Sequence, residues 1–180
     1  MEQVKDAEVV LCPIGGGGLI SGVAFAVKQI NPNCKVYGVQ AAGAPSMQNA
    51  LNVGKAEALA SVSTMADGIA VKQPGDLTFA MCQKYVDGVV TVTEDEIASA
   101  ILKLIEKHKM VAEGAGAVSI AAAMYNKVDI KGKKAVCIIS GGNVDVNVLD
   151  RIIDKALQAN GRITKLSVMA VSYTHLTLPT

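Results

Sequence analysis

Aromatic residues are scarce in this chain. They make up 3% of its 180 residues, as four Tyr, two Phe and no Trp. Hydrophobic residues nevertheless make up 51% of the sequence. The core must therefore consist mainly of aliphatic side chains, and a chain of this length can bury one substantial core. Together with the 17 glycines, this composition favours a layered α/β protein over a β-sandwich.

An excess of one charge and long apolar runs are absent as well. The net charge is +1 and no basic run is interleaved with aromatic residues, so we expect no nucleic-acid partner. The longest apolar runs, at residues 121–124 and 135–139, are far shorter than the ~20 residues that cross a bilayer, so we expect no membrane partner. Residues 1–6 lack the apolar core of a signal peptide. The four cysteines form no C-x-x-C pair, which favours reduced core thiols in a cytoplasmic protein.

The spacing of apolar residues predicts alternating strands and helices. A strand at residues 8–12, a helix at 19–30 and a strand at 35–40 form a βαβ unit, which implies a parallel sheet. Further helices are expected at 46–53, 76–85, 113–124 and 146–157, and further strands at 88–92 and 133–139. A capping box at residues 93–96 begins one more helix, which should end near residues 108–109. The expected fold is a three-layer αβα domain with a mostly parallel sheet.

A run of four glycines at residues 15–18 lies between the first strand and the first helix. Glycines there can turn backbone N–H groups inward as an anion-binding nest, and the helix N-terminus adds a positive partial charge. No Lys follows as in a P-loop, and the dinucleotide fingerprint is matched only loosely. The run fits a phosphate monoester, while a dinucleotide site and a simple flexible turn stay open as alternatives.

A second glycine loop, S-G-G-N at residues 140–143, also follows an apolar strand. Ligands of parallel α/β sheets bind at the carboxyl ends of the strands, so both loops could line one crevice. Ser140 would then offer a neutral hydroxyl group to a ligand. The alternative is a tight turn without a ligand.

Five segments of the sequence can be considered together, namely P-I-G-G-G-G-L at 13–19, M-A-D-G-I-A at 65–70, V-T-E-D-E-I at 92–97, A-E-G-A-G-A at 112–117 and I-S-G-G-N at 139–143. These segments resemble the serine/threonine dehydratase branch of the fold-type II pyridoxal phosphate (PLP) enzymes. They follow the family's order and spacing, cover about residues 5–150, and are most similar to the threonine ammonia-lyases. The resemblance implies the tryptophan synthase β-like fold, in incomplete form.

The resemblance also assigns cofactor binding to residues of these segments, namely Gly15, Gly16, Gly17, Gly18, Leu19, Gly68, Glu113 and Ser140. The glycine run and the amide that follows it would hold the PLP phosphate. Ser140 would hydrogen-bond the pyridine nitrogen, and Gly68 would let the backbone approach the ring. Glu113 would lie beside the cofactor, or alternatively complement a helix dipole.

The implied activity is the PLP-dependent conversion of L-threonine or L-serine to 2-oxobutyrate or pyruvate and ammonia, in isoleucine biosynthesis or threonine catabolism. The family's Schiff-base lysine lies in a motif that is absent here, so we expect no catalytic residue in this chain and no activity of the chain alone. No metal site is expected, since Gln40 and Pro45 stand where some relatives carry carboxylates. A homo-oligomer and a small-molecule effector are expected partners. Alternatives are a threonine synthase or cysteine synthase-like enzyme, or a non-catalytic phosphate- or nucleotide-binding module.

Four parts are expected along the chain. Residues 1–145 would be the C-terminal part of a PLP-dependent catalytic domain, and residues 146–160 a connector helix. Residues 161–170 resemble the start of a truncated ACT-like regulatory domain. Residues 171–180 contain no Asp, Glu, Lys or Arg and are interpreted as a foreign or misframed end.

Overall fold

A single parallel sheet organises the molecule, for which a computed structural model describes residues 4–166. Its strands are β1 (Val9–Pro13), β2 (Lys35–Ala41), β3 (Gly88–Val92) and β4 (Ala135–Cys137). They lie in the order β3-β2-β1-β4, and each neighbouring pair is parallel. The expected parallel sheet is confirmed, and β1 lies inside it while β4 forms an edge.

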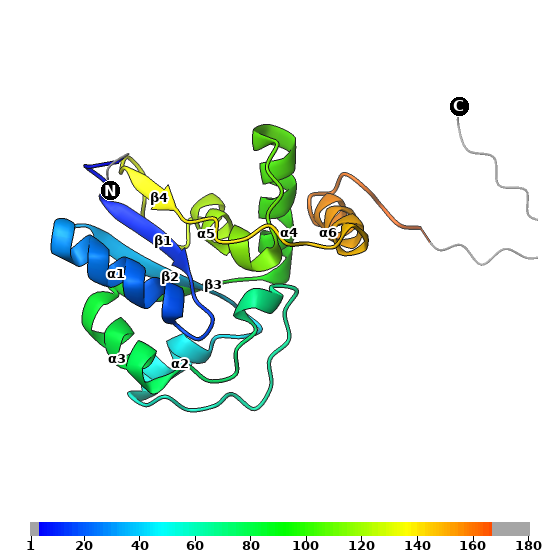
Figure 1. Cartoon of the computed structure of the whole chain (residues 1–180). Helices are drawn as coiled ribbons and strands as arrows, with labels where there is room; N and C mark the ends of the chain where they lie inside the picture. The colour runs from blue at the N-terminus through cyan, green and yellow to red at the C-terminus, as the bar shows by residue number, and fades with distance from the viewer. Residues whose placement is uncertain (1–3, 167–180) are drawn as a thin grey trace, which may run out of the picture.

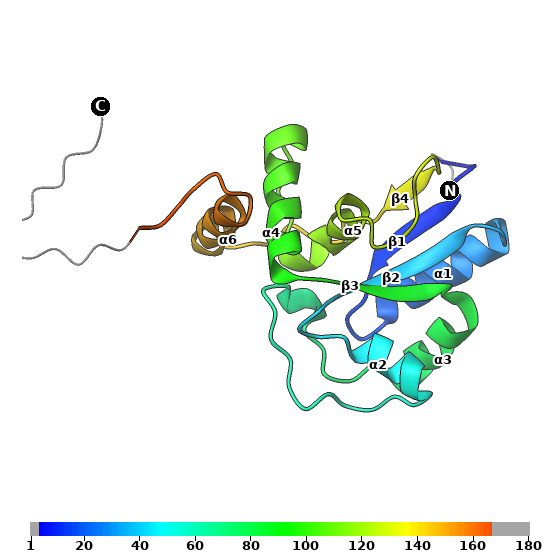
Figure 2. The ribbon, with the colours of Figure 1, turned by 180° about the vertical axis from the view of Figure 1, so that it is seen from behind.

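Helices cover both faces of this sheet. They are α1 (Gly18–Ile30), α2 (Ser46–Val53), α3 (Asp76–Tyr85), α4 (Glu94–Lys103), α5 (Gly114–Met124) and α6 (Val146–Ala159). Figure 1 shows α1, α2 and α3 on one side of the strands and α4, α5 and α6 on the other, and Figure 2 shows the same division from behind. The three-layer αβα architecture is therefore confirmed.

Strand β1 supplies side chains to both layers of the core. Val9 and Leu11 belong to the hydrophobic cluster under α4, α5 and α6, whereas Val10 and Cys12 belong to the cluster under α1 and α2. This division follows from the two-residue period of a strand, and all five residues of β1 are buried. A parallel strand that is covered on both faces has a continuous apolar sequence, so the position of β1 could be predicted from the sequence.

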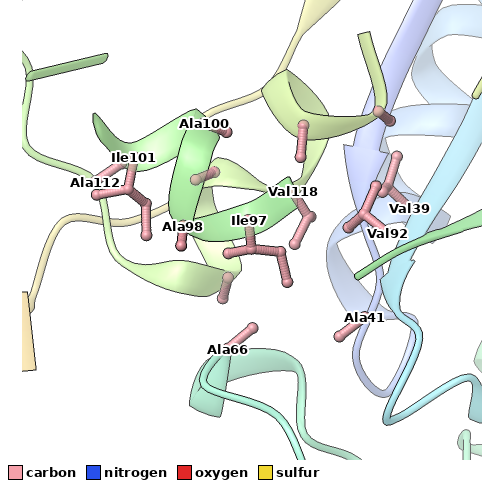
Figure 3. Packing of buried hydrophobic residues seen from close by; sticks show 14 of the residues in the cluster. Val39, Ala41, Ala66, Val92, Ile97, Ala98, Ala100, Ile101, Ala112 and Val118 are labelled. Atoms are coloured by element: carbon pink, nitrogen blue, oxygen red, sulfur yellow. The ribbon is translucent and has the colours of Figure 1, made fainter. Parts of the chain in front are cut away.

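The α5 side of the core is built from small and aliphatic side chains (Figure 3). Val118 of α5 faces Val39 and Val92 of the sheet, and Ile97 of α4 lies beside them. Seven of the eleven residues of α5 are alanine or glycine, so its backbone can lie close to the strands. The scarcity of aromatic residues thus corresponds to a thin, closely packed layer.

Helix α4 begins and ends in different ways. The capping box is confirmed, because Glu96 N–H donates to Thr93 Oγ1 at 3.3 Å and Thr93 N–H donates to the Glu96 carboxylate at 2.8 Å. After Lys103 the chain continues as a π-helical turn, Leu104–His108, and stops at Lys109 with φ 56°. The end was expected at this place, but the widened turn was not.

The chain after α6 forms no strand within the described residues, although residues 161–170 resemble the start of an ACT-like domain. Residues 161–166 are a turn followed by irregular chain, and the rest of the predicted ACT-like segment lies outside the described residues, as does the end at 171–180. Helix α6 itself buries Ile152 and Ala156 and packs against α4. No helix among residues 4–166 has the length and apolar character needed to span a membrane.

Candidate cofactor site

The two glycine loops and the start of α5 enclose one cavity at the carboxyl ends of the strands. The cavity has a volume of about 440 Å³. It is lined by Pro13, Gly15, Gly16, Gly17, Gly18, Leu19, Gly68, Ile69, Glu113, Ala115 and Ser140. All the residues to which the sequence assigned cofactor binding are therefore brought together, although they come from four separate segments.

The first loop exposes a row of backbone donors. Gly17 has φ 95° and ψ −1°, a left-handed conformation that only glycine adopts readily, and α1 begins at the next residue. Among the described residues, the N–H groups of residues 15–19 donate to no protein oxygen. A left-handed residue beside helical ones turns successive N–H groups to one side, and the N-terminus of a long helix adds positive partial charge. The loop therefore has the donors and the field that an anion requires.

The front of this loop is open and its back rests on protein. A Cβ atom at Gly18 would meet nothing within 4 Å, and one at Gly16 would meet only Val71 Cγ1, at 4.0 Å. At Gly15, by contrast, it would lie 3.0 Å from the Cα of Ile69. A ligand group could therefore approach the loop at these two positions. The residues present therefore fit a phosphate group that backbone amides hold.

Glu113 connects the second loop to the start of α5. Its N–H donates to the Gly141 carbonyl at 3.2 Å. A Cβ atom at Gly141 would overlap Glu113 Oε1, and one at Gly68 would lie 3.5 Å from the same oxygen. The carboxylate thus lies between the 140–143 loop and Gly68. Glu113 also directly precedes α5 and lines the cavity. Ser140 is exposed at the cavity.

The segment before Gly68 is fixed by a side chain that the sequence did not single out. Glu94 Oε2, at the start of α4, accepts the N–H of Met65 at 2.8 Å. Ala66 N–H donates to Thr64 Oγ1 at 3.1 Å, and Ala66 itself is buried. Glu94 lies in the capping-box motif and in the V-T-E-D-E-I segment, but neither pattern indicates a contact 29 residues away.

A second cavity lies at the opposite end of the sheet. It has a volume of about 460 Å³ and is lined by residues that precede the strands, among them Glu8, Asn31, Lys35, Asp129 and Lys133. Ligands of parallel sheets bind at the carboxyl ends of the strands, where the free N–H groups of the glycine loop are. The two cavities are similar in size, so volume does not indicate which one binds a ligand. The position and the free N–H groups favour the glycine-loop cavity.

The lining of the glycine-loop cavity contains one ionisable side chain, that of Glu113. Neither Lys nor Arg contributes to it among the described residues. The cavity can therefore bind and orient an anion through neutral dipoles. Among the described residues it offers no amine that could bond covalently to an aldehyde.

Comparison with known proteins agrees with this site. Residues 1–141 match the family described as "Pyridoxal-phosphate dependent enzyme". The chain is 59% identical over 162 residues to an L-threonine ammonia-lyase of Thermotoga maritima, covering 90% of this chain and 40% of that protein. It is 43% identical over 154 residues to the catabolic L-threonine dehydratase of Escherichia coli, covering 84% of this chain and 47% of that enzyme.

A solved structure gives the same result. The processed form of threonine deaminase isoform 2 from Solanum lycopersicum superposes with a TM-score of 0.81 at 42% identity, covering 86% of this chain and 46% of that one. The chain thus spans less than half the length of these relatives. The family match extends over most of the sequence and includes both glycine loops up to Gly141. This chain therefore belongs to the family of pyridoxal-phosphate dependent enzymes.

Proposed function

We propose that this chain is the cofactor-holding part of an L-threonine ammonia-lyase that also accepts L-serine. The observation that carries the proposal is the 59% identity to the Thermotoga maritima L-threonine ammonia-lyase, which extends over 90% of this chain. The site supports it independently, because the cavity offers the free N–H groups that a phosphate ester needs. The products would be 2-oxobutyrate or pyruvate, with ammonia.

The backbone of the first loop would hold the cofactor phosphate. The N–H groups of residues 15–19 would donate to its oxygens, and no side chain would be needed for this. Gly68 would allow the ring to approach the backbone, and Ser140 would place a neutral hydroxyl group at the pyridine nitrogen. When bound, PLP supplies the electron sink for bond cleavage in the amino acid, and the protein supplies orientation.

Glu113 would hold the 140–143 loop and the segment at Gly68 in fixed positions relative to each other. Its backbone holds Gly141, and its carboxylate lies between that loop and Gly68. Proton transfer at the substrate Cα would depend on a lysine outside the described cavity, because no lysine lines it. We therefore expect that the chain alone does not convert L-threonine.

The remaining assignments rest on the resemblance. We propose that α6 is a connector to an ACT-like regulatory domain, that the complete enzyme is a cytoplasmic homo-oligomer, and that it responds to a small-molecule effector. The relatives' names include both a catabolic and a biosynthetic L-threonine dehydratase, so either metabolic role fits.

A hybrid enzyme tests the proposed activity. This chain would replace the matching segment of the Thermotoga maritima enzyme, and formation of 2-oxobutyrate from L-threonine would be measured with added PLP. We expect turnover by the hybrid and none by the chain alone. A hybrid that folds and binds PLP but converts neither L-threonine nor L-serine would overturn the substrate assignment.

A charge placed in the loop tests the cofactor assignment. In the hybrid, Gly16→Asp would put a carboxylate into the open space in front of the N–H groups and should abolish PLP binding, measured by absorbance, while circular dichroism stays unchanged. Gly22→Asp is the matched control, because Gly22 is exposed on α1 outside the cavity and a Cβ there meets nothing within 4 Å. Normal PLP occupancy in Gly16→Asp would refute the assignment.

A further inference from the structure

The carbonyl groups of the glycine loop need donors on the side away from the cavity. In a trans peptide the C=O of one residue and the N–H of the next point in opposite directions. The Gly17 N–H can therefore face the cavity only while the Gly16 carbonyl points away from it, and the same relation joins Gly18 N–H to the Gly17 carbonyl. Whatever holds these two carbonyls also orients two of the phosphate donors.

Two hydroxyl groups hold these carbonyls from behind. Ser21 donates to the Gly17 carbonyl through its hydroxyl at 2.7 Å and its N–H at 3.0 Å. The Gly16 carbonyl accepts the Thr78 hydroxyl at 2.5 Å and the Gly75 N–H at 3.4 Å. Ser21 is one turn into α1 and is local to the loop, whereas Thr78 comes from α3, 62 residues along the chain.

The Thr78 hydroxyl group donates its proton to the Gly16 carbonyl. A threonine hydroxyl donates one proton, and two carbonyls are within reach: that of Gly16 at 2.5 Å and that of Gly75 at 3.0 Å. The Gly75 carbonyl already accepts the N–H of Phe79 at 2.8 Å, as the start of α3 requires. Without the hydroxyl, the Gly16 carbonyl would retain only its long bond to Gly75 N–H.

Thr78 also limits how far the loop can retreat. Its Cβ would lie 2.8 Å from a Cβ atom at Gly17, so it is in close contact with the back of the loop. It is half-buried and is not among the residues that line the cavity. Its contacts with the loop thus act through the backbone rather than on a ligand.

We propose that Thr78 is a positioning residue for the cofactor phosphate: its hydroxyl group, bound to the Gly16 carbonyl, keeps the Gly17 N–H turned to the cavity. This inference rests on the proposed function, since the phosphate in question is that of PLP. It assigns to α3, which contributes nothing to the cavity wall, control over the affinity of the loop.

Ligand binding to the 180-residue chain tests the inference. The probe is pyridoxine 5′-phosphate, which has the ring and the phosphate but no aldehyde that could react with surface lysines. Thr78→Val keeps the shape of the side chain and removes the hydroxyl, and it should weaken binding about 3–10-fold by calorimetry, as expected for one lost hydrogen bond. Thr78→Ser keeps the hydroxyl and should stay within about twofold of the parent. Pyridoxine without phosphate should bind all three proteins alike.

A second measurement separates failure of this inference from failure of the proposed function. In ¹⁵N NMR spectra of the free chain, Thr78→Val should shift and broaden the Gly17 amide signal, while Thr78→Ser restores it and the distant Gly132 amide stays unchanged. Equal affinity of the parent and Thr78→Val for the probe would overturn the role of Thr78 and leave the cofactor site standing. If the parent binds neither the probe nor inorganic phosphate, the cofactor site fails instead. An unchanged Gly17 signal in Thr78→Val would then still refute the positioning role.

Discussion

Strands β1 and β4 each lead into a glycine loop at the same cavity, yet the two loops are supported differently. β1 lies inside the sheet and its five residues are buried, whereas β4 is an edge strand of three half-buried residues. The loop after β1 is held by hydroxyl groups on two helices. The loop after β4 is tied to α5 by one backbone bond, from Glu113 to Gly141.

The difference indicates that the position of a strand in the sheet decides what its loop can do. A loop that is fixed on a buried strand keeps its N–H groups oriented before a ligand arrives, which lowers the cost of binding. A loop on an edge strand can adjust to a ring or to a neighbouring domain. We infer that the β1 loop determines where the phosphate lies and the β4 loop adapts to the rest of the ligand.

The largest expected effect is a loss of stability when a side chain is added to the β1 loop. Gly17→Ala would force a Cβ atom into left-handed backbone and against Met47 and Thr78, at 2.7 and 2.8 Å. We expect it to lower the free energy of unfolding by on the order of 3 kcal/mol, measured by urea denaturation. Gly132→Ala is the control, because Gly132 has φ 75° but open space around it, so only the backbone strain of about 1 kcal/mol remains. Equal losses in the two variants would show that the loop is not held from behind.

A smaller effect is expected at the opposite end of the strands. Burial alone would raise the pKa of Asp87, but hydrogen bonds from Lys28, the Val36 N–H and Lys35 hold it below its usual value. These bonds measure 2.7, 2.8 and 2.9 Å and join α1 to the starts of β2 and β3. Asp87→Asn should therefore cost on the order of 2 kcal/mol of unfolding free energy at neutral pH.

The pH dependence follows from the direction of this pKa. A carboxyl group whose pKa is lower in the folded state stabilises above its unfolded pKa of about 3.9, and this stability is lost as the pH falls toward the folded pKa. The parent should thus lose more stability than Asp87→Asn when unfolding is compared at neutral pH and near pH 3. Asp6→Asn, on the β4 side, is the control. Its acid sensitivity should be close to that of the parent, because the Asp6–Lys134 pair is largely exposed and screened by water. Equal acid sensitivity in the parent and Asp87→Asn would contradict the assignment.

The smallest effect is on thiol reactivity and leaves stability unchanged. Burial, with a contribution from the nearby Cys82, raises the pKa of Cys12 on β1 to about 12. Burial also raises the pKa of Cys137 on β4, but this side chain is only half-buried. Because the thiolate is the reactive form and must be accessible, iodoacetamide should label Cys137 well before Cys12. Peptide mass spectrometry measures the order, and urea should remove the difference. Earlier labelling of Cys12 would show that β1 is not the protected strand.

Local signals predicted most of the elements. The helices at 46–53 and 76–85 and the strand at 88–92 have the expected boundaries. The glycine run and the S-G-G-N loop were expected at one crevice, and both line the cavity. This prediction needed only a general property of parallel sheets, namely that the carboxyl ends of the strands lie at the same edge of the sheet.

What the sequence could not predict depends on contacts between distant segments. Strand β4 is shorter than the expected 133–139, and only its three residues 135–137 pair with β1. The contact of Thr78 with Gly16 joins residues from two βαβ regions, and no periodicity within α3 indicates it. The π-helical turn at Leu104–His108 was not predicted either, because the apolar spacing indicated a regular helix.

The proposed phosphate site, which is composed of main-chain donors, has a consequence for mutational scanning. Truncating side chains to alanine, the usual way to locate a binding site, removes nothing from residues 15–18, which have no side chains to lose. The loop would register only when atoms are added, so its sensitivity appears in substitutions toward larger residues. In a saturation library the loop should therefore be recognised because it does not tolerate added side-chain atoms. The residues behind it should instead be sensitive to the removal of side-chain atoms.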